Sequence, residues 1–214
     1  MESYLVPAGY GTDELVEKRS RFIGQVWPVE TEEEARARVE ETKKKYHDAR
    51  HNCWCYILRG STLRYADDGE PQGTAGQPML NVFQREAVEN VCCVVTRYFG
   101  GILLGAGGLV RAYSAAAKLA LDAAGIARMA QWDRYLLGCA YPLYERVRRL
   151  CETHGCFVAE ADFGADVSLE ILVRTDVAER FLQELREMSN AAVTVEPAGS
   201  TFQGLALDRP SEPV

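Results

Sequence analysis

The sequence has no apolar run that approaches the ~20 residues of a membrane-spanning helix. Its first residues, MESYLVPAGYG, lack the basic and apolar regions of a signal peptide. The seven cysteines are odd in number, and their spacing is not that of a disulfide framework. We therefore expect a soluble, cytoplasmic protein in a reducing compartment, without contact to a membrane.

Positive charge is also scarce, since 24 Lys and Arg face 31 Asp and Glu, for a net charge of −7. This balance excludes a protein that binds nucleic acid through a broadly basic surface. Residues 1–131 contain 16 basic and 17 acidic side chains, whereas residues 132–214 contain 8 and 14. A positive patch in the first part must therefore be local, and the second part fits an acidic interaction module.

The most informative stretch runs from Val91 to Gly125. It predicts a buried strand over 91–98 and, from about residue 107 to 124, a helix rich in Ala and Leu. Between and at the start of these elements lie Gly100, Gly101, Gly105, Gly107 and Gly108. The unpaired amides and the dipole of a helix start attract anions, and glycines let a ligand approach the backbone. The turn, with Arg97 before it and Arg111 after it, is either a phosphate-binding site or a tightly packed connection.

Two of the three histidines, His47 and His51, lie close together in a polar segment. Either one could serve as a general acid or base. A strand that begins at His51 places Cys53 and Cys55 on the same face as the histidine. Because Cys-x-Cys in a strand points its sulfurs in parallel, we interpret the two cysteines as small buried residues rather than zinc ligands.

A second polar segment, Asp67–Pro78, is a loop with many turn residues and three carboxylates, on Asp67, Asp68 and Glu70. Clustered carboxylates can hold Mg²⁺ or take part in acid–base chemistry, and Asp68 and Glu70 join the histidines as catalytic candidates. The alternative is a solvated acidic turn. No other metal or cofactor is indicated.

The second half has the pattern β-α-β-β-α-β, which is typical of a ferredoxin-like fold. Expected strands and helices cover 135–140, 142–154, 156–163, 166–174, 176–188 and 192–196. This half lacks the paired stacking aromatics of an RNA-recognition motif. We expect one domain over 1–131, a ferredoxin-like domain over 132–197 and a tail over 198–214.

Three segments together resemble the IMPACT/YigZ family (the UPF0029 group), in its bacterial two-domain form. They are HDARHNC from His47, DDGEPQGTAGQP from Asp67, and VTRYFGGILLGAGGLVRAY from Val95. The resemblance implies an α+β protein, with an N-terminal ribosomal-protein-type βαβ domain plus a C-terminal ferredoxin-like (βαββαβ) domain. It implies kinship with elongation-factor domains and small-molecule kinases, although Leu109 and Val110 stand where those kinases have serines. Eukaryotic relatives regulate translation, but through a different appended domain.

Two hypotheses follow. In the first, the protein is a non-enzymatic nucleic-acid- or protein-binding module linked to translation regulation. The glycine turn, Arg97 and Arg111 then hold an RNA phosphate, and the second half engages a ribosome-associated protein. In the second, it is a Mg-dependent enzyme acting on a small phosphorylated or nucleotide substrate. His47 or His51 then serves as the acid or base, and the loop carboxylates hold the metal.

Overall fold

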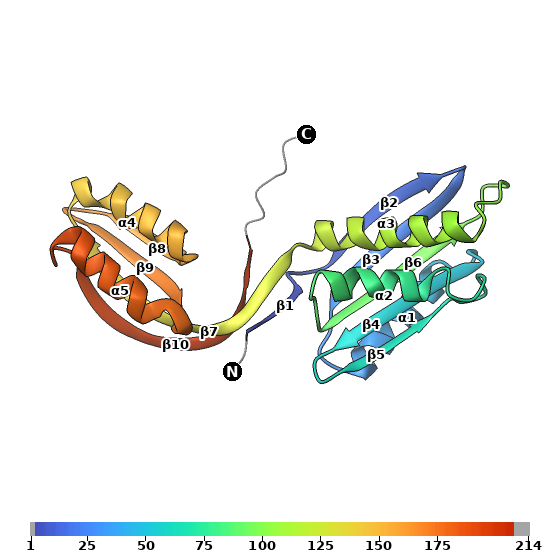
Figure 1. Ribbon diagram of the computed structural model, residues 1–214, viewed down its shortest axis with the longest axis horizontal. Coiled ribbons are helices and arrows are strands. Elements are labelled where there is room, and N and C mark those ends of the chain that lie inside the picture. The colour runs from blue at the N-terminus through green and yellow to red at the C-terminus, as the bar shows by residue number, and fades with distance from the viewer. Residues whose placement is uncertain (1–2, 208–214) are drawn as a thin grey trace. The chain divides into compact units, whose positions relative to one another are not determined.

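Residues 3–207 are described by the computed structural model of the chain (Figure 1). Their elements follow the order β1 (Tyr4–Pro7), β2 (Gly11–Glu17), β3 (Ser20–Pro28), α1 (Glu32–Lys45), β4 (His51–Leu58), β5 (Thr62–Ala66), α2 (Gly76–Arg85), β6 (Val91–Tyr98), α3 (Ala106–Ala124), β7 (Ile126–Cys139), α4 (Tyr141–His154), β8 (Phe157–Phe163), β9 (Val167–Arg174), α5 (Thr175–Ser189) and β10 (Thr194–Ala206). No helix in this described part combines the length and hydrophobicity that crossing a membrane requires.

The described residues form two compact units that meet within β7. The N-terminal unit comprises 4–129 and 204–207, and the C-terminal unit comprises 3 and 130–203. The α+β class and the two-part architecture expected from the sequence are confirmed. The domain limits 1–131, 132–197 and 198–214 stay predictions.

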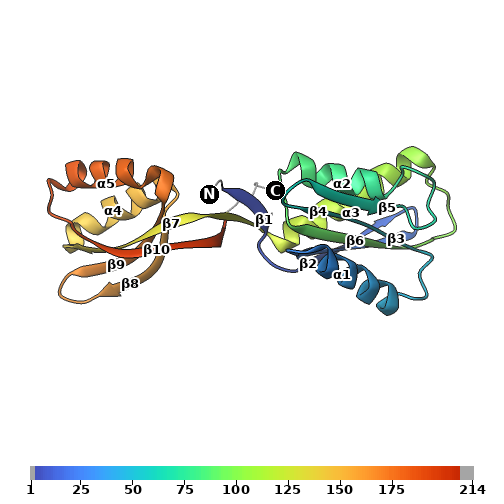
Figure 2. The same ribbon diagram turned by 90° about the horizontal axis from the view of Figure 1, so that it is seen from below.

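The N-terminal unit is built on a sheet with strand order β2-β3-β6-β4-β5, in which every neighbouring pair is antiparallel. Helix α1 covers one face, and α2 and α3 cover the other (Figure 2). The central strand β6 is almost wholly buried, because helices pack against both of its faces. Most of the core lies under α2 and α3, and a smaller cluster lies under α1.

The sequence over 31–46 predicts a helix with a capping box at Thr31 and with three lysines that complement the dipole at its end, and the start of α1 shows why the segment folds in this way. The side chain of Thr31 accepts a hydrogen bond from the Glu34 amide at 3.1 Å, and the Glu34 carboxylate accepts one from the Glu30 amide at 2.7 Å. These two bonds satisfy helix-end donors that have no intrahelical partner. The lysines at 43–45 lie at the negative end of the helix dipole, which supports their interpretation as dipole complementation.

The C-terminal unit has the sheet order β10-β7-β9-β8, with α4 and α5 on one face (Figure 1). This is the ferredoxin-like arrangement that the β-α-β-β-α-β pattern predicts. Inward residues alternate along the strands, and Leu137, Leu169 and Ile171 are buried against the helices. The opposite face of the sheet has no helix over it among the described residues.

Three details of the predicted elements are wrong. The sequence predicts one leading strand and an acidic turn over 1–18, but β1 and β2 are separate strands. It predicts a strand over 192–196 followed by a tail, but β10 continues to Ala206. Strand β7 begins at Ile126 rather than at 135, so it offers β10 a long pairing partner. That pairing outweighs the Gly and Pro content on which the prediction of a tail depends.

Candidate functional site

A pocket of about 350 Å³ lies in the N-terminal unit beside the start of α3. It is lined by side chains and backbone from β4, β6 and the two predicted motif loops: Arg50, His51, Glu70, Pro71, Arg97, Phe99, Leu103, Leu104, Gly105, Ala106 and Leu109. The three motifs that are far apart in the sequence therefore meet at one place. His51 and Arg97 are direct partners on neighbouring antiparallel strands, which explains how the first and last motifs come together.

The start of α3 forms one side of this pocket. Gly105 is its N-cap, with φ of 71°, a left-handed conformation that favours glycine. No side chain caps the helix start, and both Gly105 and Ala106 are exposed. The first amides of α3 and the positive end of its dipole are therefore available to an anion, as the sequence predicts.

Arg97 does not stand free beside the glycine turn; it belongs to a buried network. Its Nη1 lies 2.6 Å from Oε1 of Glu70, and the two side chains are 6% and 3% exposed. The hydroxyl of Tyr113 donates to the same oxygen at 2.8 Å. Burial raises the pKa of Tyr113 well above its ordinary value, so this tyrosine stays a neutral donor. Glu70 is thus a structural anchor of the guanidinium.

One N–H donor of Arg97 is not satisfied by a hydrogen bond within the described residues. Its Nη2 donates to the Ser20 hydroxyl at 3.3 Å, but its Nε is buried without a hydrogen-bond partner in residues 3–207. The guanidinium carbon lies 5.4 Å from the ring of Phe22 and 5.5 Å from that of Phe99. Buried donors are nearly always satisfied, so the Nε of this pocket-lining arginine is an exception that still lacks an acceptor.

Several predicted ligand residues lie elsewhere. Arg111, Gly108 and Lys18 line a separate pocket of about 280 Å³, so the two arginines do not flank one site. The Gly100 amide donates to Ser20, and a Cβ on Gly100 would stand 2.0 Å from the Arg19 carbonyl carbon. Gly100 is therefore needed for close packing against Arg19, and its assignment to ligand binding stays a prediction. Gly101 and Gly107 are exposed but line neither pocket.

The two histidines have different surroundings. His47 is exposed in the turn after α1 and lies outside the pocket lining. His51 lines the pocket, and its Nδ1 lies 2.9 Å from the Asp68 carbonyl oxygen. Because a carbonyl only accepts, this bond requires a proton on Nδ1 of His51.

The loop carboxylates do not converge on a metal. Asp67 accepts hydrogen bonds from the amides of Gly73, Ala75 and Gly76, and so holds the start of α2 (Gly76–Arg85). Asp68 accepts from the Asn52 amide at 2.7 Å and pairs with Lys43 at 3.1 Å.

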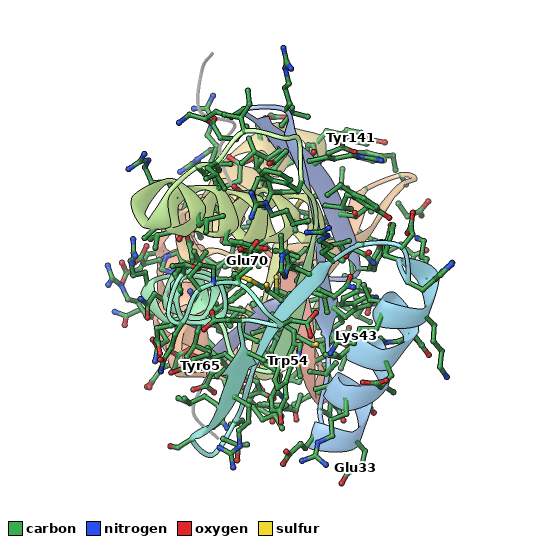
Figure 3. All side chains as sticks on the ribbon, turned by 90° about the vertical axis from the view of Figure 1, so that its right-hand side faces the viewer. Glu33, Lys43, Trp54, Tyr65, Glu70 and Tyr141 are labelled. Atoms are coloured by element: carbon green, nitrogen blue, oxygen red, sulfur yellow. The ribbon has the colours of Figure 1, made fainter. Side chains whose placement is uncertain are left out.

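Glu70 instead lies in the interior of the N-terminal unit, where it pairs with Arg97 (Figure 3). Residues 3–207 contain no group of His, Cys, Asp and Glu side chains with the arrangement of a metal site. The carboxylates that the sequence groups together therefore have separate structural roles.

Sequence reasoning missed the residues that give the pocket its open wall. Phe99 is 47% exposed and Leu103 is 82% exposed, although both are large and apolar. Arg50 is also exposed and lines the pocket next to His51. An apolar pair inside a glycine-rich turn is the signal that could have identified them, because such side chains are usually buried.

The pocket combines an uncapped helix start, an unpartnered arginine donor and an exposed aromatic ring. The first two bind a negatively charged oxygen, and the third provides a flat apolar surface. The arrangement therefore fits a ligand in which an anionic group is joined to a flat ring.

Comparisons with known proteins agree on the family. Residues 18–121 match the model of the Impact N-terminal domain, and residues 137–192 match a domain of unknown function, DUF1949. An IMPACT family member of Haemophilus influenzae is 36% identical, over 92% of this chain and 97% of the relative. YigZ of Escherichia coli is 34% identical, over 90% and 97%.

Solved structures give the same result for the fold. The crystal structure of a hypothetical protein is 34% identical and has a TM-score of 0.58, over 91% of this chain and 97% of its own. The shared coverage includes both units, so the whole two-part architecture is similar to that of a solved relative.

Proposed function

The chain belongs to the IMPACT family, and from that premise we propose that it is a non-enzymatic, cytoplasmic RNA-binding module linked to translation regulation. RNA binds in the pocket beside the start of α3. One phosphate lies at the first amides of the helix and within reach of the Arg97 Nε, and an adjacent base stacks on Phe99. The proposal needs no metal or cofactor.

The observation that supports this best is the unsatisfied Nε of Arg97, on a side chain that lines a pocket with an uncapped helix start. Glu70 neutralises the guanidinium charge but leaves this donor for an acceptor oxygen. A single-stranded nucleotide supplies both a phosphate oxygen and a flat ring. A small anion alone would leave the ring of Phe99 and the side chain of Leu103 uncovered.

The charge distribution predicts a weak dependence on salt. Arg50 is the one fully exposed basic side chain in the pocket lining, because Arg97 is buried and paired. If about two phosphates are contacted, the logarithm of affinity falls with the logarithm of salt with a slope of about −1.4. A broadly basic protein would show a much steeper dependence.

Filter binding of a labelled single-stranded RNA to the full chain tests the proposal. Phe99→Ala removes the stacking ring and is expected to weaken binding about tenfold or more, because one stacked base contributes about 1–3 kcal/mol. Arg50→Gln is expected to weaken binding and to flatten the salt slope by about 0.7. Absence of binding to the wild-type chain at about 50 mM salt would contradict the RNA assignment.

Matched controls separate the pocket from the rest of the surface. Tyr65→Ala removes a ring of similar exposure from β5, and Lys44→Gln removes an exposed positive charge from α1. Neither residue lines the pocket, so both variants should bind RNA as the wild-type chain does. Equal losses in the controls and the pocket variants would indicate nonspecific binding.

An enzyme acting on a small phosphorylated substrate is a second candidate, because His51, a side chain suited to acid–base catalysis, lines the same pocket. Thermal unfolding with added nucleotides distinguishes the two candidates. An increase in the melting temperature with a mononucleotide, and none with RNA, favours the enzyme.

A further inference from the structure

The C-terminal unit leaves one face of its sheet without a helix. Both α4 and α5 pack on the face that buries Leu137 and Leu169, and the other face is open in the described part of the unit (Figure 2). A ferredoxin-like unit with this open face has one layer of helices on one layer of sheet. The side chains on the open face are therefore free to meet a partner.

The open face is acidic. A hollow of about 300 Å³ on it is lined by four carboxylates and by no Lys or Arg: Glu160, Asp162, Glu170 and Glu196, together with Leu136, Leu137, Gly138, Ser168, Leu169 and Thr194. We call this surface the acidic sheet face. Arg134 pairs with Glu170 at 3.2 Å. Glu160, Asp162 and Glu196 have no side-chain hydrogen bond or ion pair with any residue in 3–207.

The register of the sheet places two of these carboxylates side by side. Glu160 on β8 is the direct cross-strand partner of Glu170 on β9. Like charges in opposed positions of a sheet repel each other and destabilise it. A cation from outside would remove this repulsion, whereas an anion would increase it. The face is thus complementary to positive charge and unsuited to a phosphate backbone.

The floor of the hollow is apolar. Leu136 is 44% exposed there, and Leu137 and Leu169 also line the hollow. Lys and Arg side chains pack their methylene stems on such a surface and place their charged heads at its polar rim. A hydrated metal ion or another small cation would make no use of this floor.

We propose that the acidic sheet face docks a Lys- and Arg-rich segment of a partner protein. The basic heads of the segment meet Glu160, Asp162 and Glu196, and its apolar stems cover Leu136. The inference goes beyond RNA binding, because it uses the other unit and a partner of opposite charge. A chain with both sites can join RNA to a basic protein.

Fluorescence anisotropy with a short labelled peptide of alternating Arg and Ser tests this docking on the full chain. The triple variant Glu160→Gln, Asp162→Asn, Glu196→Gln should bind the peptide about tenfold more weakly than the wild-type chain at low salt. The matched control Glu152→Gln, Glu179→Gln, Glu187→Gln removes the same charge from the exposed sides of α4 and α5. It should keep the affinity of the wild-type chain.

We call the triple variant Glu160→Gln, Asp162→Asn, Glu196→Gln the face variant. If it bound the peptide as tightly as the wild-type chain does, the proposal would be overturned. An equal loss of peptide affinity in the face variant and the control variant would also overturn it. A labelled RNA oligomer is the third probe. If the face variant lost RNA affinity, the face would bind nucleic acid instead, and the proposal would fail. Loss of RNA binding in Phe99→Ala with unchanged peptide binding shows that the two sites succeed or fail separately.

Discussion

Glutamates of the two units have opposite roles. In the N-terminal unit, Glu70 is 3% exposed and is held by Arg97 and Tyr113. In the C-terminal unit, Glu160 lies on an open sheet face opposite another glutamate and has no partner in the described chain. A buried charge must be paired, whereas an exposed charge is tolerated in water without a partner.

The difference determines how a change of charge acts in each unit. In the N-terminal unit, the buried ion pair with Glu70 positions Arg97 in the pocket lining. A change of charge there therefore alters both the stability of the fold and the shape of the pocket. On the acidic sheet face, the carboxylates of Glu160, Asp162 and Glu196 are exposed, so their charges can be removed with little effect on the fold. The predictions below test this contrast.

The largest effect is expected from Glu70→Ala. This change leaves Arg97 buried without a counter-charge, so the free energy of unfolding of the N-terminal unit should fall by about 3–5 kcal/mol. Urea unfolding followed by circular dichroism, fitted with one transition for each unit, measures it. Arg134→Gln breaks an exposed pair of the C-terminal unit and should cost less than about 1 kcal/mol. Similar losses of unfolding free energy in the two variants would contradict this difference between a buried and an exposed ion pair.

An intermediate effect is expected from the glycines of the turn before α3. Gly100→Ala brings a Cβ against the Arg19 backbone, so the N-terminal unit should lose about 1–3 kcal/mol of stability. Gly107→Ala meets only the end of Arg111 and lies in the first turn of the helix, where alanine is the better helix former. In thermal denaturation, the melting temperature of Gly107→Ala should equal or exceed that of the wild-type chain. A Gly100→Ala variant as stable as the wild-type chain would contradict the close packing of Gly100 against Arg19.

The smallest effect is the pH dependence that Glu184 gives to the stability of the C-terminal unit. A hydrogen bond from His154, and then one from Arg180, hold the pKa of Glu184 below its ordinary value of 4.5. Since the folded state prefers the ionised carboxylate, this contribution is present above pH 4.5 and is lost as the pH falls below it. Melting temperatures between about pH 6 and pH 3 should decline less steeply for Glu184→Gln. Glu179→Gln on the same helix should follow the wild-type profile.

Local patterns predicted most of the fold. The capping box at Thr31 and the alternation in 166–174 depend on neighbouring residues, and both segments fold as expected. The length of β10 and the separation of β1 from β2 depend on pairing with distant strands, which no local pattern encodes.

The candidate site was predicted in part for the same reason. The open helix start at Gly105 follows from the sequence, because the turn and the helix are contiguous. The partners of Arg97 and Asp67 do not, since Glu70 and the start of α2 approach them only in three dimensions. A sequence shows which side chains are ionisable but not which of them are already paired.

The hydrogen bonds to Asp67 from the amides of Gly73, Ala75 and Gly76 hold in place the loop that also supplies Pro71 and Glu70 to the pocket wall. A binding-site loop that is already fixed loses little conformational entropy when a ligand binds. Association should therefore be quick and should leave the backbone of this loop where it already is.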